Sequence, residues 1–216
     1  MKYEIGDFVS KPVTGICKIE DILYLDSQGE KNNKLYYLMR PVEDERETLY
    51  VPVVNTASGL RLCLTNEEAW KLIKRIPEIP TAWTDNEKMR DQKYKDAVKS
   101  NSPESLVAII KMIYQRKQKR IAQGKKSTAT DAKYFQIAEN LLYMELGMAL
   151  GQPKEEVCKT IIDFINNSGQ EDQSENGTTL YLIKRKSVNQ IRDSRSFIWN
   201  QSDFAEIVFS NFRDVQ

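Results

Sequence analysis

The periodicity of the chain changes once, near residue 60, and this change limits the folds open to it. Up to residue 54, short runs rich in Val, Ile, Leu and Tyr alternate with turn signals. From residue 65 onward, apolar residues recur at the three- and four-residue spacing of helices. Strands and helices segregated along a chain predict an α+β protein. We therefore expect a small β-module over residues 1–62 and an all-helical domain of four to five helices over residues 63–165.

The N-terminal part predicts four short strands. They are expected at Asp7–Lys11, Gly15–Leu25, Lys34–Val42 and Thr48–Val53. The turn signals between them lie at Pro12–Gly15, Asp26–Gly29 and Glu43–Glu47. Four strands within about fifty residues indicate a strongly bent sheet or a small barrel. Modules of this size usually bind other proteins or nucleic acid.

The C-terminal part of the chain contains residues typical of helix starts and ends. Capping residues are expected at Thr65 with Glu68, Thr84 with Glu87, Ser102 before Pro103, and Thr128 with Asp131. Gly151 is suited to end the long helix that starts after Thr128, and Pro153 to start a final one. The stretch from Asn166 to Thr178 reads as a linker, and the tail that follows it, up to residue 216, has no clear period.

Composition excludes several classes of function. The chain has no histidine, which excludes Ser-His-Asp and Cys-His catalysis and histidine metal ligands. Three widely spaced cysteines, Cys17, Cys63 and Cys158, indicate neither a disulfide framework nor a metal site. Phosphate-binding glycine motifs are absent as well. We expect no catalytic residue, no metal and no cofactor, although an enzyme that uses only carboxylates or lysine would pass this filter.

Neither a membrane segment nor a secretion signal is expected. No apolar run approaches the roughly 18–20 residues of a membrane helix, and the start, MKYEIGD, lacks the apolar core of a signal peptide. The odd cysteine count also suits a reducing compartment. The sequence therefore predicts a cytoplasmic protein.

One stretch, Lys111–Lys126, concentrates positive charge. KMIYQRKQKRIAQGKK holds seven basic residues and no acidic one, whereas the whole chain carries 32 Lys and Arg against 31 Asp and Glu. Apolar helical spacing ends near Ile113, so we expect the later turns to project from the domain. Local basicity favours an anionic partner. The alternative is that these residues complement the helix dipole and solvate the surface.

Two residues beside this stretch carry further expectations. Glu145 falls within the apolar arc of its helix and needs a partner, for which Arg116 or Arg120 is the candidate. If Thr84 caps the next helix, Trp83 occupies the staple position and faces Lys88, a poor apolar partner. Trp83 is then partly exposed; the alternative is that it packs under the linker at Pro77–Pro80.

Together these segments resemble a known family. GDFVSKPVTGICKIEDI and TLYVPV look like the N-terminal module of the CarD/CdnL family of bacterial transcription factors, and YQRKQKRIAQGKKSTATDAKYFQIAENLLYMELGMALG resembles its helical domain. The resemblance covers about residues 1–165. It implies a Tudor-like or SH3-like barrel, similar to that of transcription-repair coupling factors, which docks on the RNA polymerase β subunit. It further implies a helical domain that stabilises the open complex at the upstream edge of the promoter bubble.

The resemblance also assigns residues. The DNA-binding set, which would contact phosphates and the minor groove without reading sequence, is Trp83, Arg90, Arg116, Lys117, Lys119, Arg120, Lys125 and Lys126. The polymerase-binding set is Leu25, Thr48, Leu49, Tyr50, Val51 and Pro52. Some relatives carry arginine at the positions of Leu25 and Tyr50, so docking here is expected to rest on strand pairing and apolar contact. Some relatives also place the tryptophan one helical turn nearer the basic helix.

The sequence thus supports two functions. The first is a monomeric, nucleoid-associated transcription regulator that binds RNA polymerase and promoter DNA. The second is a protein-only adaptor whose β-module binds a partner by strand addition, with the basic surface merely solvated.

Overall fold

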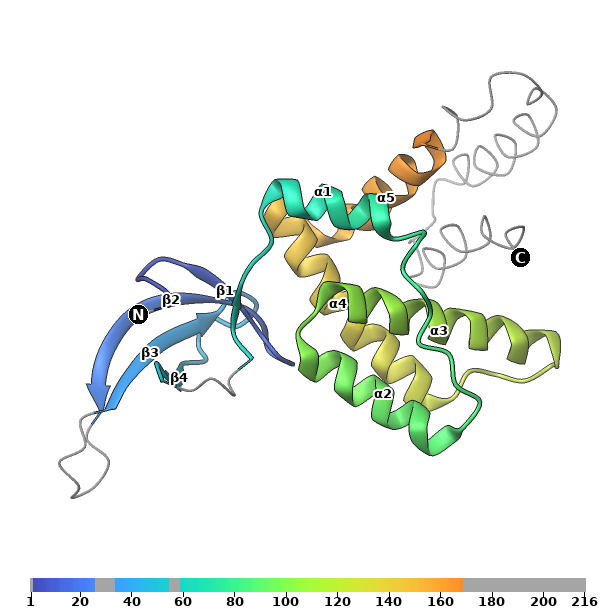
Figure 1. Cartoon of the computed structure of the whole chain (residues 1–216), viewed down its shortest axis with the longest axis horizontal. Helices are drawn as coiled ribbons and strands as arrows, with labels where there is room; N and C mark the ends of the chain where they lie inside the picture. The colour runs from blue at the N-terminus through green and yellow to red at the C-terminus, as the bar shows by residue number, and fades with distance from the viewer. Residues whose placement is uncertain (1, 26–33, 55–58, 169–216) are drawn as a thin grey trace. The chain divides into compact units, whose positions relative to one another are not determined.

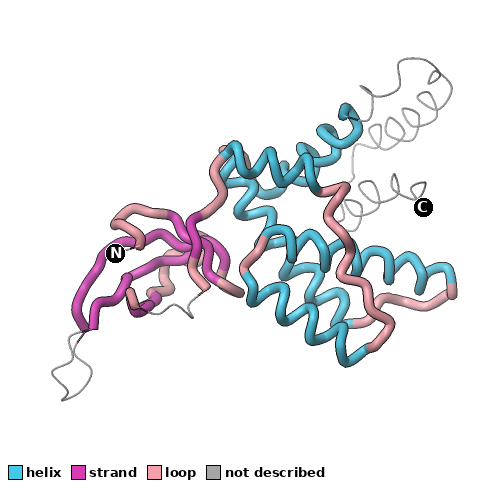
Figure 2. The backbone as a smooth tube through the Cα atoms, in the orientation of Figure 1, coloured by secondary structure: helices cyan, strands magenta, loops and turns pink. Residues whose placement is uncertain are grey.

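The computed structural model describes residues 2–25, 34–54 and 59–168. Its strands come first and its helices follow, which confirms the α+β class (Figure 2). By its internal contacts the chain divides into two compact units, Met1–Val157 and Cys158–Gln216, so the sheet and the first four helices belong to the same unit. Among the described helices, none combines the length and the apolar character needed to cross a membrane.

Five antiparallel strands form the sheet (Figure 1). They are β1 (Phe8–Lys11), β2 (Gly15–Leu25), β3 (Lys34–Pro41), β4 (Leu49–Pro52) and β5 (Arg61–Leu62), in the order β4-β3-β2-β1-β5. The first four match the predicted strands closely. The sequence missed β5, because two residues are too few to display an alternating pattern; they pair with Val9 and Ser10 of β1.

One face of the sheet carries a compact apolar core. Val9, Ile19, Tyr37 and Met39 are almost fully buried there, since alternate residues of each strand point to the same side. Tyr3 closes this core from outside the strands: its hydroxyl donates a hydrogen bond of 2.6 Å to a carbonyl of the loop before β5. On the opposite face, Tyr50 of β4 is exposed, whereas Ser10 and Ile16 are buried.

The helical part contains five helices within the described residues. They are α1 (Asn66–Arg75), α2 (Glu87–Ser100), α3 (Pro103–Ala122), α4 (Ala129–Leu150) and α5 (Lys154–Ser168). The predicted caps Thr65, Ser102 and Thr128 are confirmed, as is the left-handed Gly151 that ends α4. Helices α2, α3 and α4 pack against one another (Figure 1).

Two predicted boundaries are wrong. Helix α2 is capped by Asn86, whose side chain accepts hydrogen bonds from the N–H groups of Lys88 and Met89, and not by Thr84. Asparagine is the stronger cap of the two residues. Helix α5 continues through Ser168, into the stretch predicted as a linker. The turn predicted at Asp26–Gly29 and the tail from residue 169 lie outside the described residues.

Buried polar groups join the sheet to the helices. Glu145 of α4 receives both terminal nitrogens of Arg61 from β5, one of them at 2.6 Å, and the backbone N–H of Leu64 at 2.9 Å. The expected pairing of Glu145 with Arg116 or Arg120 is therefore wrong. The reason is that Arg61 stands on the strand that the sequence did not reveal, directly opposite this carboxylate.

Asn101, at the end of α2, makes the second polar connection. It adopts a left-handed conformation with φ of 54°, which asparagine tolerates better than most residues. Its side-chain amide donates to the carbonyls of Ser10 and Gly59, and its oxygen accepts from the Ser10 hydroxyl at 2.8 Å. Every hydrogen-bonding group of this side chain thus ties α2 to β1 or to the loop before β5.

We predict that Glu145→Ala lowers the free energy of unfolding by about 3 kcal/mol, because it leaves the Arg61 guanidinium without its buried partner. Chemical denaturation of the full chain measures the change. Glu67→Ala, which removes the exposed partner of Lys71 on α1, is the matched control and should leave the unfolding free energy nearly unchanged. Equal losses in both variants would contradict a structural role for the Arg61–Glu145 pair.

Glu139 of α4 generates a prediction on pH. Its side chain is buried; one oxygen accepts from the Tyr143 hydroxyl at 3.2 Å and the other has no hydrogen-bond partner among the described residues. Burial raises the pKa of this carboxyl from its usual value to about 7. Between about pH 4.5 and 7 the folded chain therefore binds more protons at this site than the unfolded chain does.

The folded state should accordingly lose stability as the pH rises through this window, by up to about 3 kcal/mol. Unfolding measured at pH 5 and pH 8 tests this, with Glu139→Gln as the variant that abolishes the loss. Glu155→Gln, at an exposed position on α5, should keep the pH dependence of the parent. If Glu139→Gln keeps it too, the ionisation of Glu139 does not govern stability.

Candidate functional site

Strand β4 forms one edge of the sheet, and its outer side has no partner strand among the described residues. The N–H of Val53 donates to the carbonyl of Leu35 in β3 at 2.8 Å, and Val51 lies opposite Tyr37. Because antiparallel strands alternate, Val51 directs its peptide groups toward β3 while Tyr50 directs its own outward. Tyr50 therefore presents a free backbone donor and acceptor along the edge.

The predicted polymerase-binding residues divide by the direction of their side chains. Thr48 and Tyr50 are exposed, and Tyr50 lies opposite Leu38 on the face away from the core. The side chains of Leu49 and Val51 pack toward the core instead, so they position the strand and cannot anchor a partner. The sequence prediction grouped all of them because it could not tell whether the even-numbered or the odd-numbered residues of the strand face away from the core.

Pro52 and Leu25 complete that set. Pro52 is half-buried beside Tyr36 on the same outer face, and its ring leaves no N–H at that point of the edge. Leu25 is half-buried at the end of β2, opposite Lys34 of β3. Because β3 lies between β2 and β4, Leu25 belongs to the face and not to the open edge.

Three residues outside the predicted set extend this outer face. Leu23, Tyr36 and Leu38 are half-buried, and they share the face of Tyr50 through the cross-strand pairs Leu23 with Tyr36 and Leu38 with Tyr50. An apolar sheet face next to an open edge can bind a partner strand and the side chains that flank it. Once the outward direction of Tyr50 is known, the alternation of side chains along β2, β3 and β4 identifies these three residues.

The second candidate surface is the basic end of α3. Burial ends after Tyr114, as expected: Lys119, Lys125 and Lys126 are exposed, whereas Lys117 and Arg120 are half-buried. Lys111 differs from the rest of the basic stretch. Its ammonium is buried and donates to the carbonyls of Pro77 and Ile79. Lys111 therefore holds the segment after α1 in place and is not part of the basic surface.

The turn after α3 holds these charges in place. The N–H of Lys125 donates to Arg120 and that of Gly124 to Ile121, which are the two bonds of a Schellman motif, with Gly124 at φ of 68°. The Arg120 side chain adds a hydrogen bond of 2.7 Å to the carbonyl of Lys126. Such a motif commonly carries an apolar contact between the residues at the positions of Arg120 and Lys125. Here both are cations, which makes the turn a preformed positive surface.

Two arginines of the predicted DNA-binding set are engaged inside the helical part. Arg116 donates to Asp131 at 2.8 Å, and Arg90 is only 3% exposed, between Glu87 at 2.8 Å and Asp131 at 3.8 Å. The role predicted for Arg90 requires an accessible guanidinium, so its burial excludes it from the surface. Burial opposes ionisation of Asp131, but hydrogen bonds from Arg116, Thr128 and Tyr94 outweigh it and lower its pKa.

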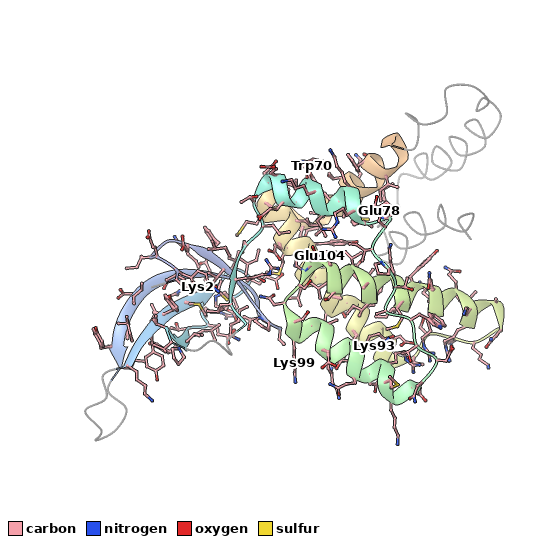
Figure 3. The ribbon with its side chains drawn as sticks, viewed as in Figure 1. Lys2, Trp70, Glu78, Lys93, Lys99 and Glu104 are labelled. Carbon is pink, nitrogen blue, oxygen red and sulfur yellow. The ribbon has the colours of Figure 1, made fainter. Side chains whose placement is uncertain are left out.

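Trp83 lies in the linker between α1 and α2, which Figure 1 shows running past α3. Because α2 starts after Asn86, Trp83 precedes the cap by three residues and the expected staple geometry does not apply. The indole is half-buried, and the ammonium of Lys119 lies 4.0 Å from its ring centroid. Its carbonyl accepts from Lys93 of α2, a side chain labelled in Figure 3.

Chemistry of other kinds finds no support in the described part of the chain. It contains no group of three His, Cys, Asp or Glu residues that could hold a metal ion. Burial raises the pKa of the Cys17 thiol to about 11 and that of Cys63 to about 12, so neither is a thiolate near neutral pH. The two surfaces described above are therefore the candidate functional site.

Comparison with known proteins identifies the sheet. Residues 3–62 match the family described as the CarD-like/TRCF RID domain, which is an RNA polymerase β-interacting module. This match confirms the family resemblance for the N-terminal module, from Tyr3 through the end of β5. The helices lie outside the matched residues. No curated protein matches the chain.

Proposed function

We propose that this protein regulates transcription by bridging RNA polymerase and promoter DNA. The outer face and open edge of β4 bind the polymerase β subunit, and the basic end of α3 contacts DNA at the upstream edge of the bubble, where it stabilises the open complex. The protein acts as a binding protein and not as an enzyme, as a monomer at the nucleoid. The observation that carries the proposal is the outward-facing Tyr50 on the edge of a module matched to polymerase-interacting domains.

Strand addition explains how the module would hold its partner. The free peptide groups of Tyr50 pair with a partner strand, and its ring, 50% exposed, supplies an aromatic anchor. The apolar neighbour Leu38 widens the contact. No charge is needed on this face, which agrees with the absence of arginine at positions 25 and 50.

Phosphate neutralisation explains the role of the basic surface. Lys125 and Lys126 are exposed on a rigid turn, and lysines of this kind bind the DNA backbone without reading its sequence. So few contacts give weak binding to free duplex. Docking on polymerase compensates, because tethering raises the effective DNA concentration into the millimolar range.

We predict that Tyr50→Glu weakens binding to the polymerase β subunit at least tenfold, because it places a charge in an apolar contact. Surface plasmon resonance with immobilised β subunit measures this. Tyr24→Glu is the matched control: Tyr24 is also an exposed tyrosine of the module, but it lies on the other face, opposite Leu35. It should bind like the parent.

A second variant separates the backbone from the ring. Tyr50→Pro removes an N–H that β3 does not use, so the sheet keeps its own hydrogen bonds while strand addition loses one. Binding should fall in this variant as well. Parent-like affinity in both Tyr50 variants, with the fold intact by circular dichroism, would contradict docking through β4.

For DNA, we predict that the double substitution Lys125→Ala with Lys126→Ala lowers the affinity evenly across duplex sequences. It should also reduce the slope of log K against log salt by about two, because two phosphate contacts are lost. The control is the double substitution Lys71→Ala with Lys74→Ala, which removes the same charge from exposed positions on α1. Fluorescence anisotropy at several salt concentrations compares the two.

The protein-only adaptor makes the opposite forecast. If the variant without Lys125 and Lys126 binds DNA as the control does, the basic turn is only solvated and the adaptor is favoured. The two functions share the docking edge of β4, so the polymerase measurement does not separate them. The DNA measurement does.

A further inference from the structure

The linker between α1 and α2 is shaped by lysine side chains and not by secondary structure. Residues 77–86 form neither helix nor strand. At the start of the linker, Lys111 of α3 donates to the carbonyls of Pro77 at 3.0 Å and Ile79 at 2.7 Å. Pro77 and Pro80 lack N–H groups, so the segment cannot continue as a regular helix, and the Lys111 ammonium supplies the donor for two of its carbonyls.

Two further lysines act at the end of the linker that carries Trp83. Lys93 of α2 donates to the carbonyls of Ala82 and Trp83, both at 3.1 Å, and thereby fixes the two peptide groups that flank the Cα atom of Trp83. Lys119 of α3 places its ammonium 4.0 Å from the ring centroid, within the range of a cation–π interaction. A weak hydrogen bond from Ala82 to Ala108 also seats this segment on α3.

We propose that Lys93 and Lys119 are positioning residues for Trp83: Lys93 sets the path of its backbone and Lys119 holds the indole against α3. This inference rests on the proposed function and extends it to Trp83, whose indole lies beside Lys119 of α3 and would meet the distorted DNA at the bubble. It adds that the orientation of Trp83 is fixed before DNA arrives, by residues that belong to two different helices.

The physical reason lies in preorganisation. An apolar side chain that enters the minor groove as a wedge must unstack two bases, and a mobile side chain would lose rotamer entropy in addition. An indole already held by a backbone clamp and a cation avoids most of this second loss. The cation–π contact of Lys119 is weak because the pair is accessible to water, so DNA can displace it.

The first test needs no DNA. The full chain is labelled with 5-fluorotryptophan, and the ¹⁹F resonance of Trp83 is assigned by its absence in Trp83→Phe. The shift of this resonance between H₂O and D₂O reports the exposure of the ring. Lys119→Gln should increase that shift, whereas Lys119→Arg, which keeps a cation, should restore the parent value. Lys93→Met should broaden the resonance or add a second one.

Controls separate positioning from general damage. Lys117→Gln changes the neighbouring charge on α3, and Lys95→Met changes an exposed lysine of α2; both should leave the Trp83 resonance as in the parent. The resonance of Trp70 should stay unchanged in every variant. An unchanged Trp83 resonance in both Lys93→Met and Lys119→Gln would overturn the proposal.

The second test measures function, and it distinguishes the positioning role of the lysines from the role of Trp83 in DNA binding. Lys93→Met should shorten the open-complex lifetime to the same extent as Trp83→Ala while the salt slope of DNA binding stays unchanged, because Lys93 does not contact phosphate. A parent-like lifetime in Lys93→Met, when Trp83→Ala shortens it, would also overturn the positioning role. If Trp83→Ala itself leaves the lifetime unchanged, the wedge function fails, and the ¹⁹F result still decides whether these lysines hold the ring.

Discussion

The buried contact between Arg61 and Glu145 is the interaction on which the arrangement of the protein depends. A carboxylate that is 2% exposed needs hydrogen-bond donors, and here it has two guanidinium nitrogens and the N–H of Leu64. All these donors come from the segment that leaves the sheet, while the acceptor belongs to the long helix α4. Together with the hydrogen bonds of Asn101, this contact fastens the β-module to the helices. A small β-module and a basic helix end would otherwise be independent binding elements.

Rigid attachment has a consequence for function. If the module docks on polymerase, the direction in which the basic turn of α3 points is set by the joint between sheet and helices. Apolar packing supports the same joint: a Cβ atom on Gly15 would lie 3.2 Å from the Met144 side chain of α4, so glycine allows the close approach of β2 to this helix. Weak DNA contacts then suffice, because the docked protein already directs the basic turn of α3 toward the DNA.

Local signals predicted most of the fold, and the failures share one cause. Thr65, Ser102 and Thr128 were found because a cap and its helix are neighbours in sequence. The partner of Glu145 was not found, because Arg61 is distant in sequence and stands on a strand of two residues. The burial of Arg90 likewise follows from Asp131, a residue of another helix. In the basic stretch, composition could not distinguish the engaged Arg116 and the buried Lys111 from the exposed lysines of the turn.

We propose that a single chain bridges polymerase and promoter DNA, and site-specific photo-crosslinking is the most direct measurement of this bridging. A photoreactive amino acid at position 126, on the basic turn, is activated in complexes of the full chain with promoter DNA, with and without RNA polymerase. We predict crosslinks to DNA at the upstream edge of the bubble. These crosslinks should require polymerase and should disappear when the chain also carries Tyr50→Glu. Crosslinks only to protein, or crosslinks to DNA that are equally strong without polymerase, would contradict it.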